Sequence, residues 1–317
     1  MAYSPATAEA CFKHVCFFYQ AEAEYAATVA GFLRAGLAGG EAAFAAVPPD
    51  KISLIRDALG ADAGNVEFAD MTTLGRNPAW IIPQVLAFIG AHAGHVRYVG
   101  EPIWAACGPA EVRAAMQHET LINLAFADAD AEILCPYDIA ALDPAVIADA
   151  RRTHPLLLSS GRRSMSPEYA VPSDTLPSRS LPLPALTNGA MYHTYRTDLS
   201  QVRALVLQHA REAGLTESRA DDLVLAVSEV AANTLRHTQS SGTLAVWHDR
   251  DEIVCEVHDE GTIANPQAGR RRPAPDATGG HGLWLVHQVC DLVELHSDAS
   301  GTTIRMHMAI QPPERNG

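Results

Sequence analysis

An acid and an amide stand one helical turn apart in the segment LAVSEVAANTLR, residues 225–236. Glu229 and Asn233 are four residues apart, so on a helix both side chains project from the same face. The amide oxygen of Asn233 is a hard ligand suited to Mg²⁺, which takes few protein ligands when it is bound to a triphosphate. A carboxylate one turn away can accept a proton from a hydroxyl that attacks a γ-phosphate. The pair taken alone also fits an ordinary exposed polar helix face.

A second polar turn, VHDEGT at residues 257–262, follows a segment with the pattern of a strand. The carboxylate of Asp259 at the strand end can accept a hydrogen bond from an exocyclic amine, which favours adenine over guanine. Gly261 lets the backbone approach a flat base closely. An ordinary Asp-Glu-Gly turn has the same local sequence, so this turn is informative only together with its neighbours.

A glycine-rich turn, GGHGLWLV at residues 279–286, leads into an amphipathic helical pattern. Gly279, Gly280 and Gly282 leave backbone N–H groups free to bind phosphate at the positive end of a helix. A flexible turn before a helix is the simpler alternative. The order of acid, amide, Asp-x-Gly turn and glycine turn within one compact module is therefore the strongest signal in the chain.

These segments, SEVAANTLRH, VHDEGT, GGHGLWLVHQVCD and GTTIRMH, span about residues 190–311. Together they resemble the N, G1 and G2 boxes of the GHKL ATPase superfamily, and within it the bacterial anti-sigma factor kinases of the sporulation and general-stress type. The resemblance implies ATP and Mg²⁺ as ligands, with Glu229 as catalytic base, Asn233 as Mg²⁺ ligand and Asp259 as adenine reader. It further implies that the phosphate and lid region and the adenine pocket are lined by Gly280, Gly282, Leu283 and Thr303.

Two features of the lid segment depart from that pattern or extend it. Ile263 stands after DEGT where the family often has a second glycine, which stiffens the start of the lid. The lid, about residues 262–278, carries Arg270, Arg271 and Arg272. One of them either contacts a γ-phosphate as a cation or belongs to a solvated basic loop.

A histidine-kinase interpretation requires a phosphoacceptor histidine on an upstream dimerisation helix, usually followed by an acid. His193 is followed by Thr194, and His209 by Ala210, so neither has that context. Most of the 14 histidines are better explained as surface or packing residues.

The elements that position the nucleotide residues follow from periodicity. Residues 199–213 and 218–238 have helical spacing, whereas residues 243–248, 252–258, 293–297 and 302–310 have the pattern of strands. Helices on one face of an antiparallel sheet predict an α+β two-layer sandwich, the GHKL or Bergerat ATPase fold.

The first half of the chain alternates helices and strands instead. Helices are expected at 24–37, 51–59, 80–93 and 109–126, and strands at 42–47, 66–68, 96–99 and 131–135. This alternation predicts an α/β domain with a mostly parallel sheet. A Pro- and Ser-rich stretch divides the chain into a domain at 1–158, a linker at 159–188 and a domain at 189–317.

Three stretches of the first domain, residues 14–47, CPYDIAAL at 135–142 and the His154–Pro155 step, resemble the MEDS sensory domain of methanogen and methylotroph regulators. That resemblance covers about residues 11–158 and implies a RecA-like α/β fold. No GxxxxGK[ST] motif is present, so no P-loop nucleotide site is expected. Four side chains can line a small-molecule pocket at the carboxyl ends of the strands, with packing or protein docking as alternatives: His14, Tyr19, Tyr137 and Asp138.

The composition indicates which kinds of molecule the protein can bind. The net charge is −14, which argues against nucleic acid, since phosphate backbones require a cationic surface. A basic protein partner suits this field better. No apolar run long enough to span a bilayer and no signal peptide are recognised. Six cysteines without CxxC spacing predict reduced thiols in the cytoplasm, with a redox or metal role for Cys11 and Cys16 as the less favoured alternative.

The combined prediction is a cytoplasmic anti-sigma regulator. Its C-terminal domain would bind ATP–Mg²⁺, sequester a sigma factor and phosphorylate a serine or threonine of a STAS-type antagonist, with the N-terminal domain as sensor. The resemblance also implies a homodimer. The alternatives are a non-catalytic ATP-gated binding module and an orphan sensor histidine kinase.

Overall fold

The computed structural model describes residues 12–171, 183–186, 189–238, 240–249, 251–274, 276–277 and 279–311. The chain forms two compact units. The first contains Met1–Gly75, Gln84–Gly108 and His118–Pro172, and the second contains the remaining segments, including Ser173–Gly317. Among the described residues, no helix is both long and apolar enough to cross a membrane.

The N-terminal domain is built on a sheet in the order β3-β2-β4-β5-β1-β6-β7. All neighbouring strands pair in parallel except β6 and β7, which are antiparallel. The mostly parallel sheet predicted from the sequence is therefore confirmed. The strands are β1 (Lys13–Tyr19), β2 (Ala42–Val47), β3 (Val66–Asp70), β4 (Val96–Gly100), β5 (Ala131–Asp138), β6 (Leu156–Ser159) and β7 (Arg162–Met165).

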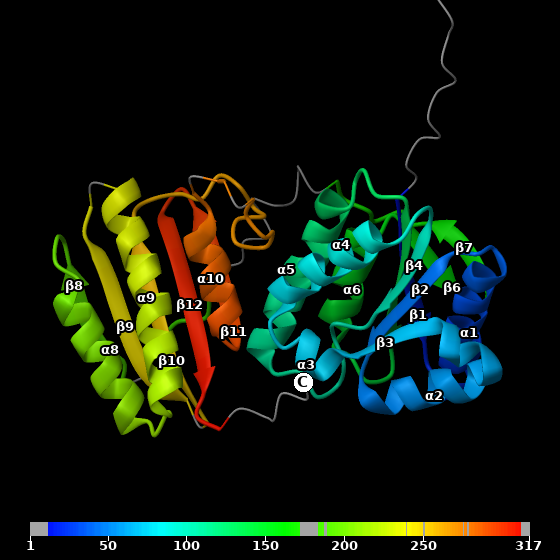
Figure 1. Cartoon of the computed structure of the whole chain (residues 1–317), viewed down its shortest axis with the longest axis horizontal. Helices are drawn as coiled ribbons and strands as arrows, with labels where there is room; N and C mark the ends of the chain where they lie inside the picture. Colours follow the sequence, from blue (N-terminus) through cyan, green and yellow to red (C-terminus); the bar gives the residue numbers. More distant parts are fainter. Residues whose placement is uncertain are drawn as a thin grey trace, which may run out of the picture. The chain divides into compact units, whose positions relative to one another are not determined.

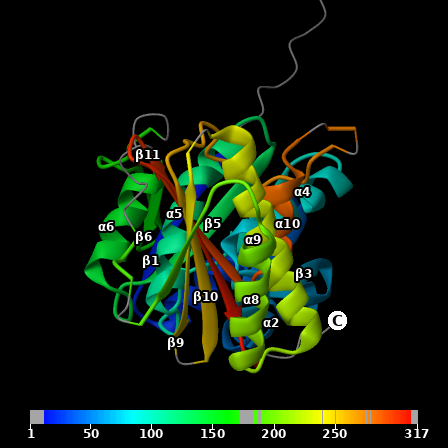
Figure 2. The ribbon, with the colours of Figure 1, turned by 90° about the vertical axis from the view of Figure 1, so that its left-hand side faces the viewer.

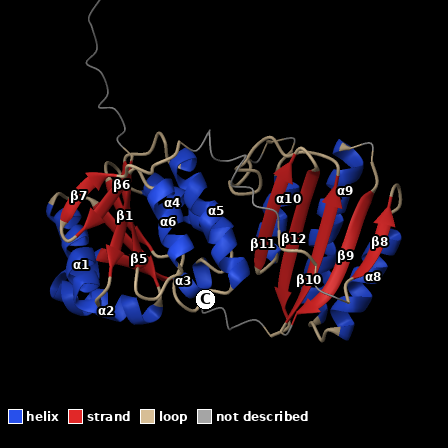
Figure 3. Cartoon of the chain, turned by 180° about the vertical axis from the view of Figure 1, so that it is seen from behind, coloured by secondary structure: helices blue, strands red, loops and turns tan. Residues whose placement is uncertain are grey.

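Helices cover both faces of this sheet (Figure 1). The longer ones are α1 (Glu22–Ala38), α2 (Pro49–Leu59), α4 (Ile81–Ala91), α5 (Pro109–Ala125) and α6 (Pro144–Thr153), with short turns at α3 (Met71–Leu74), η1 (Gly60–Asn65) and η2 (Pro78–Trp80). In the view from behind, α1 and α2 lie on the side opposite to α5 and α6 (Figure 3). Because both faces are covered, the central strands are apolar almost throughout, as in KHVCFFY of β1 and AAFAAV of β2.

One strand falls inside the range assigned to the linker. β7 pairs with β6 through a turn at Ser160 and Gly161, both with positive φ. Its sequence, RRSM, is exposed along its whole length, so an edge strand here has no alternation of apolar and polar residues to reveal it. Within the same predicted linker, residues 172–182 and 187–188 lie outside the described residues.

The C-terminal domain is an antiparallel sheet in the order β11-β12-β10-β9-β8. Its elements are β8 (Met191–Tyr195), α8 (Ser200–Glu212), α9 (Glu217–His237), β9 (Gly242–Asp249), β10 (Glu252–Asp259), α10 (His281–Val289), β11 (Leu292–Asp298) and β12 (Gly301–Ala309). With this domain toward the viewer, α8, α9 and α10 all lie on one side of the sheet (Figure 2). This arrangement confirms antiparallel strands covered by helices.

Alternation along the strands fixes which face meets the helices. Cys255 and Val257 of β10, with Ile304 and Met306 of β12, join Val227 of α9 in one apolar core. Residues one position out of phase point to the other face, because successive side chains of a strand alternate. The sequence pattern thus determines which polar residues at the strand ends can reach the helices.

Candidate nucleotide-binding site

The acid, the amide and the third glycine of the turn meet where α9 and α10 lie side by side. A Cβ atom added at Gly282 would lie 2.9 Å from Oε2 of Glu229 and 3.6 Å from Nδ2 of Asn233. Both polar side chains are half-buried on α9, one turn apart. The chain therefore brings the first turn of α10 against the face that carries the carboxylate and the amide.

The amide oxygen of Asn233 already faces a cation. Its Oδ1 accepts a hydrogen bond of 2.9 Å from the exposed guanidinium of Arg236, one turn further along α9. The amide oxygen of Asn233 thus points toward a positive charge, as a metal ligand does. A metal ion bound to this oxygen has to replace the hydrogen bond from Arg236. The sequence reasoning did not single out Arg236; its i+3 position relative to Asn233 is the signal that was available.

The carboxylate of Asp259 is fixed from two sides at the end of β10. Its Oδ2 accepts a hydrogen bond of 2.6 Å from the hydroxyl of Thr234, and its Oδ1 accepts one of 2.8 Å from the backbone N–H of Gly261. The Thr234 hydroxyl is in turn 3.0 Å from the hydroxyl of Tyr195, whose pKa burial raises to about 12. Each carboxylate oxygen has two acceptor positions, so one on each remains for a ligand.

The turn after Asp259 is closely packed. A side chain at Gly261 would come within 2.7 Å of Cγ2 of Thr238, so the position requires glycine. The backbone carbonyl of Gly261 accepts a hydrogen bond of 2.8 Å from the hydroxyl of Thr302. Ile263, where the family pattern expects glycine, donates its backbone N–H to Ser297 at 2.9 Å and packs against the core. The side chain of Ile263 therefore anchors the start of the lid.

The structure does not bring Thr303 to this site. Asp259 is paired with Thr302 and His258 with Thr303 across β10 and β12, so Thr303 shares the opposite face with His258, at 3.0 Å from its Nδ1. The expectation erred by one residue because two threonines are adjacent and a one-residue step changes the face. Thr302, which is buried next to the Asp259 turn, is the threonine on the helix-covered face.

The glycine turn begins α10 with a free N-terminus. Gly280 caps the helix with φ of 87°, a left-handed conformation that favours glycine, and no side chain caps the helix. Leu283 is partly buried against the core one turn later. A Cβ added at Gly269 would lie 2.9 Å from Cβ of Leu283, so the lid segment packs on this helix.

The three lid arginines have different environments. Arg270 is buried, and burial lowers its pKa to about 10. Arg271 and Arg272 are exposed, and Arg271 donates to Oε1 of Gln267 at 3.0 Å. Of the three, Arg271 and Arg272 are exposed to solvent and Arg270 is not; the end of the predicted lid, Thr278, lies outside the described residues.

Neither histidine of the histidine-kinase alternative lies on a helix in the required context. His193 is in strand β8, and His209 is in α8 with its Nδ1 3.4 Å from a carboxylate oxygen of Glu212. This arrangement gives no support to a phosphoacceptor at either position.

In the N-terminal domain the four predicted pocket residues separate. His14 and Tyr137 are buried between the sheet and α6, where their neighbourhood includes His154. Tyr19 instead points to the carboxyl ends of β1 and β4, where its hydroxyl donates to Oε1 of Glu101 at 3.1 Å. Asp138 is half-buried and accepts from the backbone N–H of Ala140 at 2.9 Å. No single pocket formed by the four is seen.

Two buried groups near these residues were missed by the sequence reasoning. Glu101 accepts from Tyr19 and, at 2.9 Å, from the hydroxyl of Tyr25, and burial raises the pKa of Glu101 to about 7. The second group surrounds His14. Of the cysteines considered for redox or metal chemistry, Cys16 is buried and Cys11 lies outside the described residues.

Comparison with known families assigns each domain separately. Residues 13–155 match the model of the MEDS family, the methanogen/methylotroph DcmR sensory domain. Residues 194–308 match the histidine kinase-like ATPase domain. The chain therefore combines a MEDS match with an ATPase-domain match, as the motifs predict. The search of curated proteins finds no match.

Among solved structures, the chain is similar to the crystal structure of the RsbU and RsbW domains of Rv1364c from Mycobacterium tuberculosis. The two are 20% identical, with a TM-score of 0.28, and the match covers 39% of this chain and 34% of that one.

Proposed function

We propose that the C-terminal domain binds ATP with Mg²⁺ at the site formed by α9, the end of β10 and the start of α10. The observation that carries this proposal is the contact geometry of Gly282, which sets the N-terminus of α10 against Glu229 and Asn233. Backbone N–H groups at that N-terminus bind phosphate, and the carboxylate of Asp259 binds the adenine amine. The match to a histidine kinase-like ATPase domain supports the same assignment.

The residues present fit a phosphoryl transfer. Mg²⁺ bound to the triphosphate would neutralise its charge. Asn233 would hold the metal through its amide oxygen, in place of the hydrogen bond from Arg236. The carboxylate of Glu229 accepts the proton of the attacking hydroxyl, and Asp259, oriented by Thr234 and Gly261, selects the base. The exposed Arg271 and Arg272 of the lid segment would supply the cation that contacts the γ-phosphate.

The regulatory role that we propose is of the anti-sigma type. The domain would sequester a sigma factor and transfer phosphate to a serine or threonine of a STAS-type antagonist, in a stress or sporulation pathway of the cytoplasm. The acidic net charge of −14 suits a partner with basic DNA-binding surfaces. The N-terminal domain, which matches a sensory family, would adjust this switch in response to a signal. A homodimer through the ATPase domain and a RecA-like fold of the N-terminal domain are further parts of the proposal.

One observation favours a second candidate, a nucleotide-gated binding module without transfer. Arg236 occupies the Asn233 oxygen that a metal ligand has to offer. If Arg236 is not displaced, nucleotide binds but metal-dependent transfer fails. The two functions therefore differ at the catalytic step and agree on nucleotide binding.

A pull-down from the native lysate followed by a transfer assay tests the proposal. The full chain serves as bait with ATP–Mg²⁺ or with ADP–Mg²⁺, and recovered proteins are identified by mass spectrometry. The recovered antagonist is then incubated with the chain and γ-labelled ATP. We expect acid-stable label on the antagonist, reduced at least about 100-fold by Glu229→Gln and unchanged by Asp221→Asn, an exposed acid on the same helix.

Two results of that assay would replace the proposal. Binding of nucleotide and partner without label on any recovered protein would establish the module without transfer. Acid-labile label on the chain itself would establish a histidine kinase instead.

A further inference from the structure

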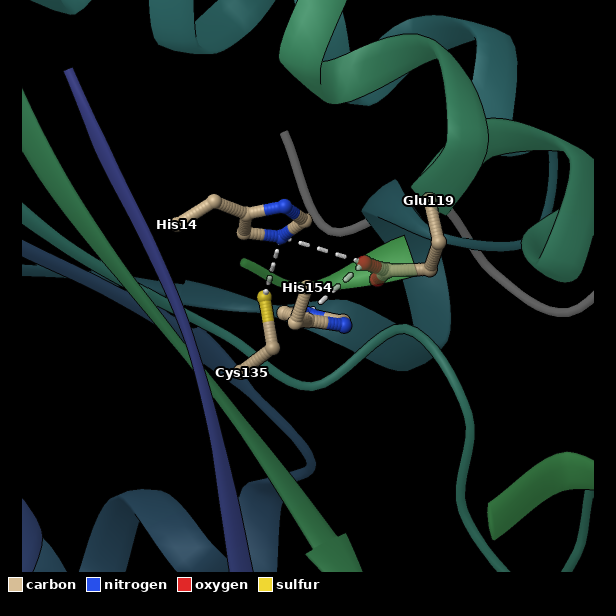
Figure 4. Close-up of side chains that lie close together, drawn as sticks. All are labelled: His14, Glu119, Cys135 and His154. Carbon is tan, nitrogen blue, oxygen red and sulfur yellow. Dashed lines mark hydrogen bonds and ion pairs between the residues drawn. The ribbon is translucent and has the colours of Figure 1, made fainter. Parts of the chain in front are cut away.

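Four side chains that are distant in the sequence meet in the interior of the N-terminal domain: His14 of β1, Glu119 of α5, Cys135 of β5 and His154 at the end of α6 (Figure 4). We call them the His14 cluster. All four are buried, and one ligand atom from each lies within 4.8 Å of the others. Oε2 of Glu119 is 3.3 Å from Nε2 of His14 and 3.3 Å from Nε2 of His154, and Sγ of Cys135 is 3.4 Å from Nε2 of His14.

The other ring nitrogen of each histidine is held by an outer partner. Nδ1 of His14 is 3.2 Å from Oδ1 of Asn123, whose amide nitrogen donates to the backbone carbonyl of Thr153 at 2.7 Å. Nδ1 of His154 is 2.8 Å from the backbone carbonyl of Ala150. These acceptors require protonated Nδ1 atoms, which in neutral rings leaves the Nε2 lone pairs directed into the cluster. Histidines that bind metals are oriented in this way, with the second nitrogen donating to a carbonyl.

The cluster has more acceptors than protons. The two Nε2 lone pairs face the carboxylate of Glu119, and the thiol of Cys135 can supply one proton only. Neither carboxylate oxygen of Glu119 has a hydrogen-bond partner among the described residues, and Nε2 of His154 has none either. Buried polar groups are nearly always satisfied, so a positive centre between these atoms accounts for their arrangement.

The burial of the cluster leads to the same conclusion. A buried carboxylate that no hydrogen-bond donor compensates needs a cation beside it.

A nucleophilic Cys–His pair is the obvious alternative and does not fit. Burial and the Glu119 charge raise the pKa of the Cys135 thiol well above its ordinary value. A reactive thiol needs the opposite shift together with access to substrate. Both Cys135 and His14 are almost completely inaccessible, so the cluster is suited to holding a small ion.

We propose that the His14 cluster binds one zinc ion through Nε2 of His14, Nε2 of His154, Sγ of Cys135 and a carboxylate oxygen of Glu119. Two imidazoles, one thiolate and one carboxylate form a mixed, borderline-soft donor set of four, which suits tetrahedral Zn²⁺. Binding displaces the thiol proton of Cys135, which leaves as a solvated proton. The ion would join two strands and two helices of the sensory domain, so that its loading becomes a condition of the domain's structure.

Metal analysis of the full chain tests the site directly. The protein is stripped with a chelator, reloaded with Zn²⁺, dialysed and measured by mass spectrometry of the elements, with circular dichroism to confirm folding. We expect roughly one zinc per chain in the wild type and a near-complete loss in Cys135→Ser, His154→Gln and Glu119→Gln. Cys16→Ser is the matched control, because Cys16 is buried on β1 directly across from Cys135 and is not part of the cluster.

Cobalt substitution gives a second readout that does not depend on stoichiometry. Co²⁺ in the wild type should show d–d bands of tetrahedral intensity and a thiolate charge-transfer band, and Cys135→Ser should lose the charge-transfer band. Asn123→Ala, which removes the partner of His14 Nδ1 together with the donor to the Thr153 carbonyl, should weaken zinc affinity by about 10–100-fold while the fold is retained.

Three outcomes would overturn the proposal: wild type that retains no zinc after reloading, equal zinc in the wild type and the ligand variants, or zinc lost equally in Cys16→Ser. The first would mean that a shared proton bridges Glu119 and the two histidines. The others would place the metal elsewhere.

Discussion

The hydroxyl of Thr234 on α9 donates a 2.6 Å hydrogen bond to the carboxylate of Asp259 at the end of β10. This bond ties the residue that is proposed to read adenine to the helix that carries the proposed catalytic base. A hydrogen bond to a charged group contributes about 1.5–3 kcal/mol. Orientation of Asp259 is therefore a property of the domain before nucleotide arrives.

Thr234→Val should weaken ATP binding by about 10-fold or more, because the valine keeps the shape of the side chain and removes the donor to Asp259. Isothermal titration with ATP–Mg²⁺ measures the change. Thr194→Val, on the exposed side of β8, is the control and should bind as the wild type does. Equal affinity in the two variants would show that Thr234 does not position Asp259 for the base.

Gly282→Ala should disturb the Glu229 carboxylate, since the new Cβ would lie 2.9 Å from its Oε2. The crowding destabilises the packing of α10 against α9 by about 1–3 kcal/mol. We expect slower phosphoryl transfer and weaker ATP binding. Gly31→Ala is the control, because that glycine lies at an exposed position of helix α1 and an added Cβ meets nothing within 4 Å. An unchanged rate of phosphoryl transfer in Gly282→Ala would show that the close approach of Gly282 to Glu229 does not matter for catalysis.

Stability of the C-terminal domain should fall as the pH rises through about 8. Burial opposes the charge on His307, but hydrogen bonds to Glu252 and Glu294 outweigh it and raise the pKa to about 8. The folded state thus keeps a proton that the unfolded state releases near its ordinary pKa, a contribution of about 2 kcal/mol that is present at pH 6 and lost at pH 9. Urea unfolding at both pH values should show this loss in the wild type and not in His307→Gln. Equal losses would contradict the assignment.

The stability of the N-terminal domain should also fall as the pH rises, because of Glu101. Burial raises the pKa of Glu101 to about 7, although the hydroxyls of Tyr25 and Tyr19 favour the ionised form. Between the ordinary pKa and about 7 the folded state binds the extra proton, so stability falls with pH over that window by about 3 kcal/mol. Glu101→Gln should abolish this dependence and be more stable than the wild type at pH 8. If Glu101→Gln keeps the wild-type dependence of unfolding free energy on pH, the proton is bound by a group other than Glu101.

Elements with strong periodicity and the meeting of Glu229, Asn233 and Gly282 could be predicted from the sequence, whereas the strand face of a single polar residue could not. The strand at 42–47 was predicted with its observed bounds because its apolar run is stopped by two prolines. β7 lacks any apolar pattern, so the sequence does not predict a strand at these residues. Thr303 was predicted from the motif alone, and the pairing of β12 with β10, which sets the face of each threonine, could not be predicted from the motif.

The His14 cluster shows the limit of motif reasoning most clearly. Its members are distributed from β1 to the end of α6, without the short spacing that marks many metal sites. His14 lies in an apolar strand and Glu119 is almost fully buried on α5. Only the crossover connections of the parallel sheet bring them together. A charged residue on the buried face of a helix is the signal that could have indicated a partner.

Titration of the full chain with ATP–Mg²⁺ measures nucleotide binding itself, with Asp259→Asn as the variant and Asp249→Asn, an exposed acid on β9, as the control. We expect saturable binding of ATP in preference to GTP by the wild type and the control, and a loss of about 10-fold or more in Asp259→Asn. Failure of the folded wild type to bind ATP, or the same affinity in Asp259→Asn, would contradict the proposed nucleotide site.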